Sequence, residues 1–194
     1  MQLIEESVFM KCENHISLFF HIIMHSDAET ASDQQTRVTA NQLSILTTQG
    51  WVTHVGCRGQ NGMSDVVAYV DGGSLGNPGP SGIGVVLDSE GRTIRIAKWI
   101  GRQDNNVAEY IAVLEALQCA LALKARKLHI YSDSEVVVRQ MRGEYICRSP
   151  RLYSLNWICR KLARSFDFTI SHVRREHNTE ANRLANSAVR KHIP

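Results

Sequence analysis

The chain has 194 residues, of which 43% are hydrophobic and 21% are charged, a composition typical of a folded globular protein. Its longest apolar run, residues 16–24, is too short to cross a bilayer, and Glu5 and Glu6 stand where a signal peptide requires positive charge, so neither a membrane protein nor an exported one is expected. The five cysteines form no zinc-binding pattern, which favours a cytoplasmic protein with reduced thiols.

The formal net charge of +3 is unevenly distributed along the chain. Residues 1–64 carry 3 basic and 6 acidic side chains, whereas residues 65–194 carry 19 basic and 13 acidic ones. Because Lys and Arg release counterions from a phosphate backbone, the basic part favours a polyanionic partner.

The first 64 residues lack a consistent periodicity. Residues 29–42 are polar and rich in Thr, Ser and Gln, and residues 56–62 have the composition of a linker. This segment is compatible with a small helical appendage, a disordered arm or sequence upstream of the biological start. We therefore predict an extension over residues 1–64 and a domain over residues 65–194.

From Asp65 onward, short apolar runs alternate with turns. Residues 66–70 are typical of a buried strand, and a glycine-rich turn over residues 72–80 follows. Residues 83–87 and 93–100 predict two further strands, joined by a turn.

The remaining elements alternate between helix and strand. Apolar residues at helical spacing predict the clearest helix at 106–124. The order of elements predicts the α/β class, with a five-stranded mixed sheet flanked by helices. The elements that follow the first helix are a strand at 128–131, helices at 134–141 and 150–164, a strand at 166–173, and a helix at 178–191 capped by Asn178.

Three acidic residues occur at the ends of these elements. Asp71 ends the first strand, Glu109 lies in the first turn of the clearest helix, and Asp133 ends the fourth strand. If the two strands are neighbours, their aspartates lie about 5 Å apart, within reach of the glutamate. Each residue alone is explained as a turn former, a helix-dipole partner or a helix cap. Together they favour a site for Mg²⁺ or Mn²⁺, because clustered carboxylates repel one another without a cation.

The segments around these residues resemble the four motifs of the type 1 ribonuclease H family. They are residues 71–84, 105–110, 131–134 and 173–186, in the family's order. The resemblance covers residues 65–194 and implies the RNase H-like fold. It also implies an endonuclease that hydrolyses the RNA strand of an RNA/DNA hybrid.

The resemblance implies two Mg²⁺ or Mn²⁺ ions, held by Asp71, Glu109, Asp133 and Asn182. One ion activates a water molecule and the other stabilises the leaving oxygen. His177 lies where the family often has a histidine that assists proton transfer or product release. Position 182 is normally an aspartate; asparagine keeps an oxygen ligand but no charge, so the second ion should bind more weakly.

Substrate contacts are also implied by the resemblance. No lysine-rich protrusion lies between Arg142 and Arg160, as in the short bacterial or archaeal form, and we expect a monomer. Trp99 and Trp157 are interpreted as packing residues, because neither lies in a matched motif. The residues expected to contact the hybrid are Gly72, Gly73, Ser74, Asn77, Asn105, Asn106, Ser134, Arg174 and Arg175.

Three alternatives remain at this stage. A hybrid-binding protein of the same fold could have lost catalysis through Asn182. A proofreading exonuclease would carry an Asp-x-Glu pair on the first strand, where this chain has Asp71-Gly72-Gly73, and an integrase would bring a zinc or DNA-binding domain. A purely structural interaction domain leaves the three acidic residues unexplained.

Overall fold

The computed structural model describes residues 64–192. The chain divides into two units, Met1–Gly62 and Met63–Pro194, and the described residues belong to the second. The predicted extension therefore lies outside the described residues, apart from Ser64. The elements are β1 (Asp65–Ser74), β2 (Gly79–Ser89), β3 (Arg92–Gln103), α3 (Asn105–Ala122), β4 (Lys127–Ser132), α4 (Glu135–Arg142), α5 (Pro150–Ala163), β5 (Asp167–His172), the short 3-10 helix η1 (Arg175–His177) and α6 (Thr179–Arg190).

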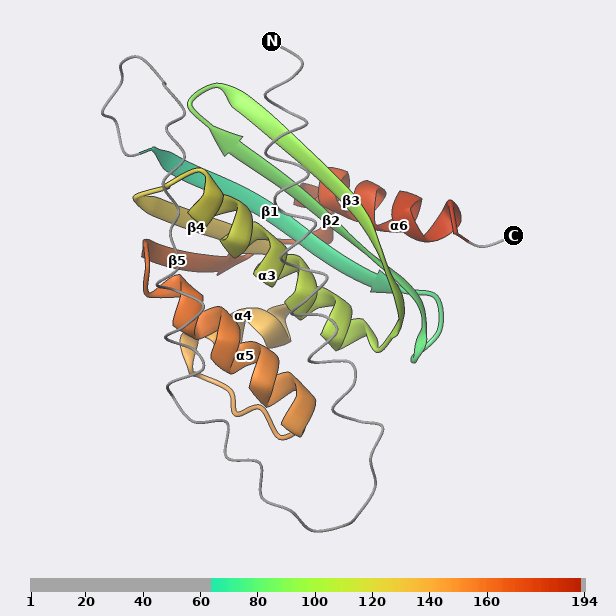
Figure 1. Cartoon of the computed structure of the whole chain (residues 1–194). Helices are drawn as coiled ribbons and strands as arrows, with labels where there is room; N and C mark the ends of the chain where they lie inside the picture. Colours follow the sequence, from blue (N-terminus) through green and yellow to red (C-terminus); the bar gives the residue numbers. More distant parts are fainter. Residues whose placement is uncertain (1–63, 193–194) are drawn as a thin grey trace, which may run out of the picture. The chain divides into compact units, whose positions relative to one another are not determined.

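The five strands form one mixed sheet in the order β3-β2-β1-β4-β5 (Figure 1). The first three strands pair antiparallel, whereas β1 with β4 and β4 with β5 pair parallel. This confirms the predicted fold class and the order of the elements. Parallel pairing of β1 with β4 brings their carboxyl ends to one edge of the sheet.

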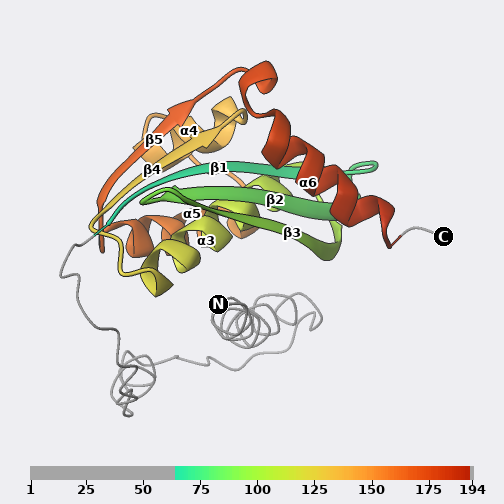
Figure 2. The same cartoon turned by 90° about the horizontal axis from the view of Figure 1, so that it is seen from above.

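Helices cover the two faces of the sheet unequally. Figure 2 shows α6 on one face and α3 with α5 on the other. The side chains of β1 divide accordingly, because alternate residues of a strand face opposite sides. Val66, Ala68 and Val70 are at most 1% exposed, and a Cβ on Gly72 would lie 2.1 Å from the Ala108 backbone in α3. The core therefore lies mainly between β1 and α3.

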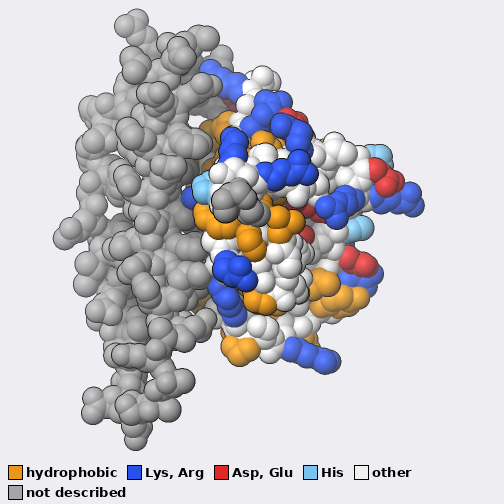
Figure 3. All heavy atoms as spheres, turned by 90° about the vertical axis from the view of Figure 1, so that its right-hand side faces the viewer, with side chains coloured by type: hydrophobic (Ala, Val, Ile, Leu, Met, Phe, Trp, Pro, Cys, Tyr) orange, Lys and Arg blue, Asp and Glu red, His pale blue; other side chains and the backbone are white. Residues whose placement is uncertain are grey.

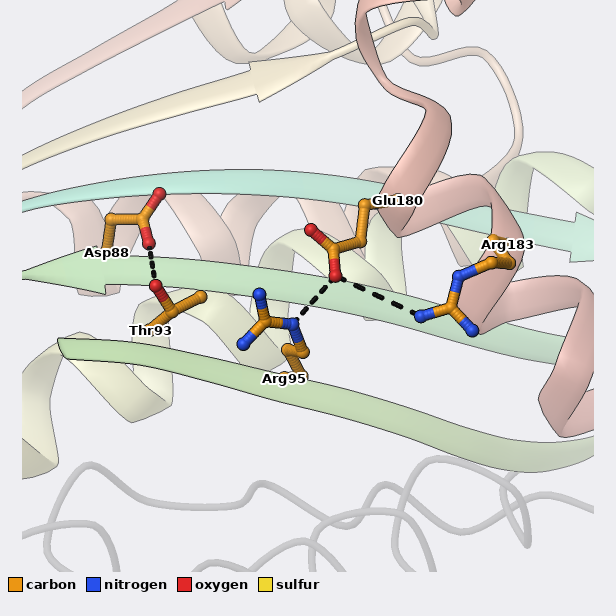
Figure 4. A network of polar contacts seen from close by, with 5 residues as sticks. All are labelled: Asp88, Thr93, Arg95, Glu180 and Arg183. Atoms are coloured by element: carbon orange, nitrogen blue, oxygen red, sulfur yellow. Dashed lines mark hydrogen bonds and ion pairs between the residues drawn. The ribbon is translucent and has the colours of Figure 1, made fainter.

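Glycines let α6 approach β2 closely. A Cβ on Gly84 would overlap the backbone oxygen of Ala181, at a separation of 1.9 Å. Beside this contact, Arg95 Nε of β3 donates a 2.7 Å hydrogen bond to Glu180 Oε1, which also lies 3.9 Å from Arg183 (Figure 4). Since this network is exposed, it contributes little stability, and the backbone contact fixes the position of α6.

The strands are longer than predicted around the first turn. The sequence predicts a turn over residues 72–80, but β1 continues to Ser74 and β2 begins at Gly79. Gly72 and Gly73 pair with Ile83 and Gly82, so the antiparallel ladder persists through the glycines. Asp71 therefore lies inside β1 and not at its end.

The close approach of α6 predicts a stability difference between two glycine variants. Gly84→Ala should destabilise the fold by about 2–3 kcal/mol, because the added methyl group overlaps backbone that cannot move aside easily. Gly73→Ala is the matched control, since its Cβ would meet nothing within 4 Å. Chemical denaturation monitored by circular dichroism measures both. Equal stability of the two variants would contradict the close approach.

Candidate active site

Asp71 and Asp133 lie at the edge where β1 and β4 run side by side. Val70 of β1 pairs with Ser132 of β4, and the residue that follows each of them in the chain is an aspartate. Asp71 is 5% exposed, and an oxygen of its carboxyl group lies within 4.8 Å of an oxygen of Asp133. The predicted convergence of these residues is confirmed.

Glu109 joins the two aspartates from α3. It is 7% exposed and lies just beyond the first turn of the helix, not within it as expected. Its Oε2 accepts a 3.2 Å hydrogen bond from the backbone N–H of Gly72, which holds the side chain against β1. One oxygen of each of the three carboxyl groups lies within 4.8 Å of the other two. We refer to Asp71, Glu109 and Asp133 as the acidic cluster.

Burial and mutual repulsion disfavour the charged form of this cluster. Burial first, then the negative charge of Asp133, raises the pKa of Asp71 to about 7. Burial also raises the pKa of Glu109 well above its ordinary value, with further contributions from both aspartates. A divalent cation would remove this penalty, and carboxylate oxygens are ligands that Mg²⁺ and Mn²⁺ prefer. The residues therefore fit a metal.

The positive charge of Arg175 offsets part of the repulsion. Its guanidinium lowers the pKa of both Asp71 and Glu109, although less than burial raises them. The same guanidinium lies against the amide of Asn182. When the amide oxygen faces it, that oxygen accepts bonds of 2.7 Å from Nη2 and 3.1 Å from Nε. A guanidinium has only donors, so this orientation is the favourable one.

Asn182 lies beside the acidic cluster, on the first turns of α6. Its terminal amide lies 3.5 Å from Asp71 Oδ2. The structure therefore brings together all four residues that the sequence predicted as metal ligands, while ligation of a metal by each of them stays a prediction.

Asn178 enters the same site, which the sequence did not predict. The residue stands at the N-cap of α6 as expected, but its side chain does not cap the helix. Its Nδ2 instead donates to Val70 O at 2.8 Å and to Asp133 Oδ1 at 3.0 Å. The only available sequence signal was its place four residues before Asn182, on the same side of a helix.

Six of the nine predicted substrate residues lie on two segments that are joined to each other, the end of β1 with the β1–β2 turn and the start of α3. Asn77 Oδ1 accepts a 3.0 Å hydrogen bond from the backbone N–H of Asn105, and Ser74 Oγ donates to Gln103 O at 3.0 Å. The β1–β2 turn is thereby fixed to the start of α3. Asn106 is exposed there, Gly73 is half-buried, and Ser134 precedes α4.

His177 and Arg174 are exposed and lie outside the acidic cluster. Arg174 lies 3.6 Å from Glu176. Their roles therefore stay predictions.

The interpretation of Trp157 as a packing residue is wrong: its side chain is 53% exposed on α5, with Lys161 5.8 Å above the ring. A helical position can face solvent even when its side chain is apolar.

The end of the domain toward which β1 points carries many basic side chains. Figure 3 shows Lys and Arg spread over the described part of that face, with few acidic groups. Such a surface attracts a phosphate backbone.

None of the helices within residues 64–192 combines the length and apolarity that crossing a membrane requires.

Comparison with known proteins places the chain in a family. A family model described as reverse transcriptase-like matches residues 69–188, more than half of the chain. The crystal structure of RNase H1 from Halobacterium salinarum superposes with a TM-score of 0.63 at 38% identity, covering 66% of this chain and 98% of that one. The chain belongs to the type 1 ribonuclease H family.

Other type 1 ribonucleases H give the same result. LC11-RNase H1, solved in complex with an RNA/DNA hybrid, superposes with a TM-score of 0.62 at 35% identity and covers 66% of this chain and 98% of that one. A bifunctional protein of Mycobacterium tuberculosis is 40% identical over 128 residues, 64% of this chain. The chain spans only 35% of the length of that relative.

The raised pKa values predict an unusual pH dependence of stability. Because the pKa of Asp71 is about 7 in the folded chain, above the ordinary 3.8, its contribution favours folding at low pH and is lost as the pH rises through 7. In EDTA at about pH 9, Asp71→Asn should therefore be more stable than the unchanged chain by roughly 2–4 kcal/mol. Denaturant titrations at about pH 3 and pH 9 measure this difference, which should vanish at the lower pH. A less stable variant at both pH values would contradict the argument.

Proposed function

We propose that the chain hydrolyses the RNA strand of RNA/DNA hybrids with two bound divalent metal ions. The observation that carries the proposal is the buried acidic cluster, three carboxyl oxygens within 4.8 Å of one another, in a domain of the type 1 ribonuclease H family. Burial without a cation is unfavourable for such a cluster, so its retention inside the fold supports a metal-dependent function.

The residues of the site have different roles in the proposed reaction, according to their chemistry. Asp71, Glu109, Asp133 and Asn182 would hold the two ions, the three carboxylates with their negative charge and Asn182 with a neutral oxygen. Bound ions supply an activated water and stabilise the leaving 3′ oxygen of the RNA strand. Arg175, exposed beside the cluster, attracts the phosphate and offsets the carboxylate charge while substrate approaches.

Recognition of the hybrid is assigned to the β1–β2 turn and the start of α3. Backbone and amide groups of Gly73, Ser74, Asn105 and Asn106 present small donors and acceptors at this edge. A 2′-hydroxyl is both a donor and an acceptor, so such groups can distinguish RNA from DNA. The structure of LC11-RNase H1 in complex with an RNA/DNA hybrid supports a hybrid as the ligand.

A hybrid-binding protein with impaired catalysis is the second candidate. Asn182 favours it, because the amide is neutral and its oxygen accepts hydrogen bonds from Arg175, where a catalytic member of the family would bind a metal ion. The acidic cluster is nevertheless complete, and the oxygen of Asn182 can bind a metal in competition with Arg175. We therefore expect reduced activity and not its loss. A monomeric state and a cytoplasmic location stay predictions from the sequence.

The proposed activity is tested on a hybrid with both strands labelled. In Mg²⁺ or Mn²⁺ the RNA strand should be cut and the DNA strand left intact, and EDTA should stop the reaction. Asp71→Asn should lower the rate by at least about 1,000-fold, because it removes a ligand charge from the centre of the cluster. Cleavage that persists in EDTA, or equal cutting of both strands, would exclude the proposed mechanism.

Asn182→Asp tests the fourth position separately. The added charge should lower the metal concentration needed for half-maximal cleavage by several-fold to roughly 100-fold, because a carboxylate attracts the second ion more strongly than a neutral amide does. Titration of Mg²⁺ and Mn²⁺ against the cleavage rate measures it, with Ser187→Asp farther along α6, where the hydroxyl donates to Leu184 O, as a control for charge alone. If both variants behave like the unchanged chain, position 182 is not a ligand. If the Asn182→Asp variant cleaves hybrid and the unchanged chain does not, the unchanged chain is the impaired binder.

A further inference from the structure

Asn178 is nearly as buried as any residue of the core, although it stands at the start of a helix. It is 1% exposed. An N-cap asparagine ordinarily uses its side-chain oxygen to accept a bond from the first turn of its helix. Here that bond is absent, so the side chain is used for something other than starting α6.

The amide instead connects three segments. Its Nδ2 donates to the backbone oxygen of Val70 in β1 and to Oδ1 of Asp133 after β4, at 2.8 and 3.0 Å. Both acceptors need a donor, so the nitrogen must face them. The amide oxygen consequently has no hydrogen-bond partner in the described part of the chain, although it is buried.

An unpaired buried oxygen destabilises a fold, because its bond to water is lost on folding and is not replaced. The position is therefore poorly suited to stability alone. The two donated bonds have a different consequence. The bond to Val70 holds the amide in place, and the bond to Asp133 fixes one oxygen of that carboxyl group. The orientation of the other carboxyl oxygen is thereby set as well.

We propose that Asn178 is a positioning residue of the metal site, which sets the orientation of Asp133 through its amide. The inference rests on the proposed function, because Asp133 is assigned there as a metal ligand. The amide also anchors to Val70, the residue immediately before Asp71. One side chain thus ties the geometry of both aspartates to the start of α6, the helix that carries Asn182.

This role differs from that of Asn182. Asn182 is proposed to supply an oxygen to an ion, whereas the oxygen of Asn178 is buried and its nitrogen is engaged by carboxyl and carbonyl groups. Asn178 therefore acts on the metal only through Asp133. Groups that orient a metal ligand in this way change metal affinity by about 10–100-fold when they are removed.

The test compares Asn178→Ala with Asn156→Ala in the full chain. Asn156 is a matched control: it is 7% exposed, and its Nδ2 donates to the hydroxyl of Tyr110, away from the acidic cluster. Mn²⁺ affinity is measured by calorimetry without substrate, together with thermal unfolding in EDTA and with kcat and KM on hybrid. Asn178→Ser, which keeps one shorter donor, is the second variant if the alanine variant does not fold.

The expected result is a specific loss of metal affinity. Asn178→Ala or Asn178→Ser should bind Mn²⁺ at least about 10-fold more weakly, with kcat at limiting metal reduced, KM for hybrid little changed, and partial rescue by excess Mn²⁺. Asn156→Ala should lower the unfolding temperature and leave the Mn²⁺ affinity unchanged.

The outcomes separate this inference from the proposed function. Mn²⁺ affinity within about twofold of the unchanged chain in the Asn178 variants would overturn the positioning role, even if hybrid cleavage is observed. An equal loss of Mn²⁺ affinity in Asn156→Ala would overturn it too, since general destabilisation would then be the cause. Mn²⁺ binding that depends on Asn178, in a chain that cleaves no hybrid, would instead refute the proposed function and leave the positioning role intact.

Discussion

The clustering of three carboxyl groups, two of them buried, at the junction of β1, β4 and α3 is the constraint on which the rest of the site depends. Each group would be hydrated in the unfolded chain, and folding removes that hydration while bringing like charges together. Burial raises the pKa of both Asp71 and Glu109 as a result. The hydrophobic core between β1 and α3 must hold the cluster in place against this penalty. The site is thus less stable than its surroundings until a cation binds.

The contact between α6 and β2 determines which groups complete the cluster. Gly84 is in register with Asp71, and the backbone of α6 passes directly over that glycine. This close approach places the start of α6 over the edge of the sheet. Asn178 and Asn182, one helical turn apart, thereby reach Asp133 and Asp71 respectively. Small residues in the strand therefore position polar residues in the helix.

The fold and the acidic cluster were both predictable from the sequence, for a common reason. Apolar periodicity located the strands and helices, and Asp71, Glu109 and Asp133 stood near their ends inside segments resembling family motifs. Element boundaries were less predictable: Gly72 and Gly73 indicated a turn, but cross-strand pairing kept them in β1. Local sequence describes the preference of a glycine and not the hydrogen-bonding partner that the sheet provides.

Long-range contacts account for the features that the sequence did not predict. Asn178 had the pattern of a helix cap, and its partner Val70 lies 108 residues away. The exposure of Trp157 likewise depends on which face of α5 packs on α3, a choice that apolarity alone does not make.

The charge balance of the site explains how an asparagine fits at position 182. A fourth carboxylate there would add repulsion to a cluster in which two pKa values are already raised, with Arg175 as the nearby positive charge that lowers both. The neutral amide avoids that repulsion and accepts hydrogen bonds from the same guanidinium. It therefore stabilises the metal-free state, and in the proposed function this would come at the expense of affinity for a second ion. A second ion bound as proposed would be a cation drawn to the same oxygens of Asp71 and Asn182 as Arg175, so each would reduce the attraction available to the other. In the proposed function, substrate phosphate would relieve this conflict, because its negative charge would attract both cations at once.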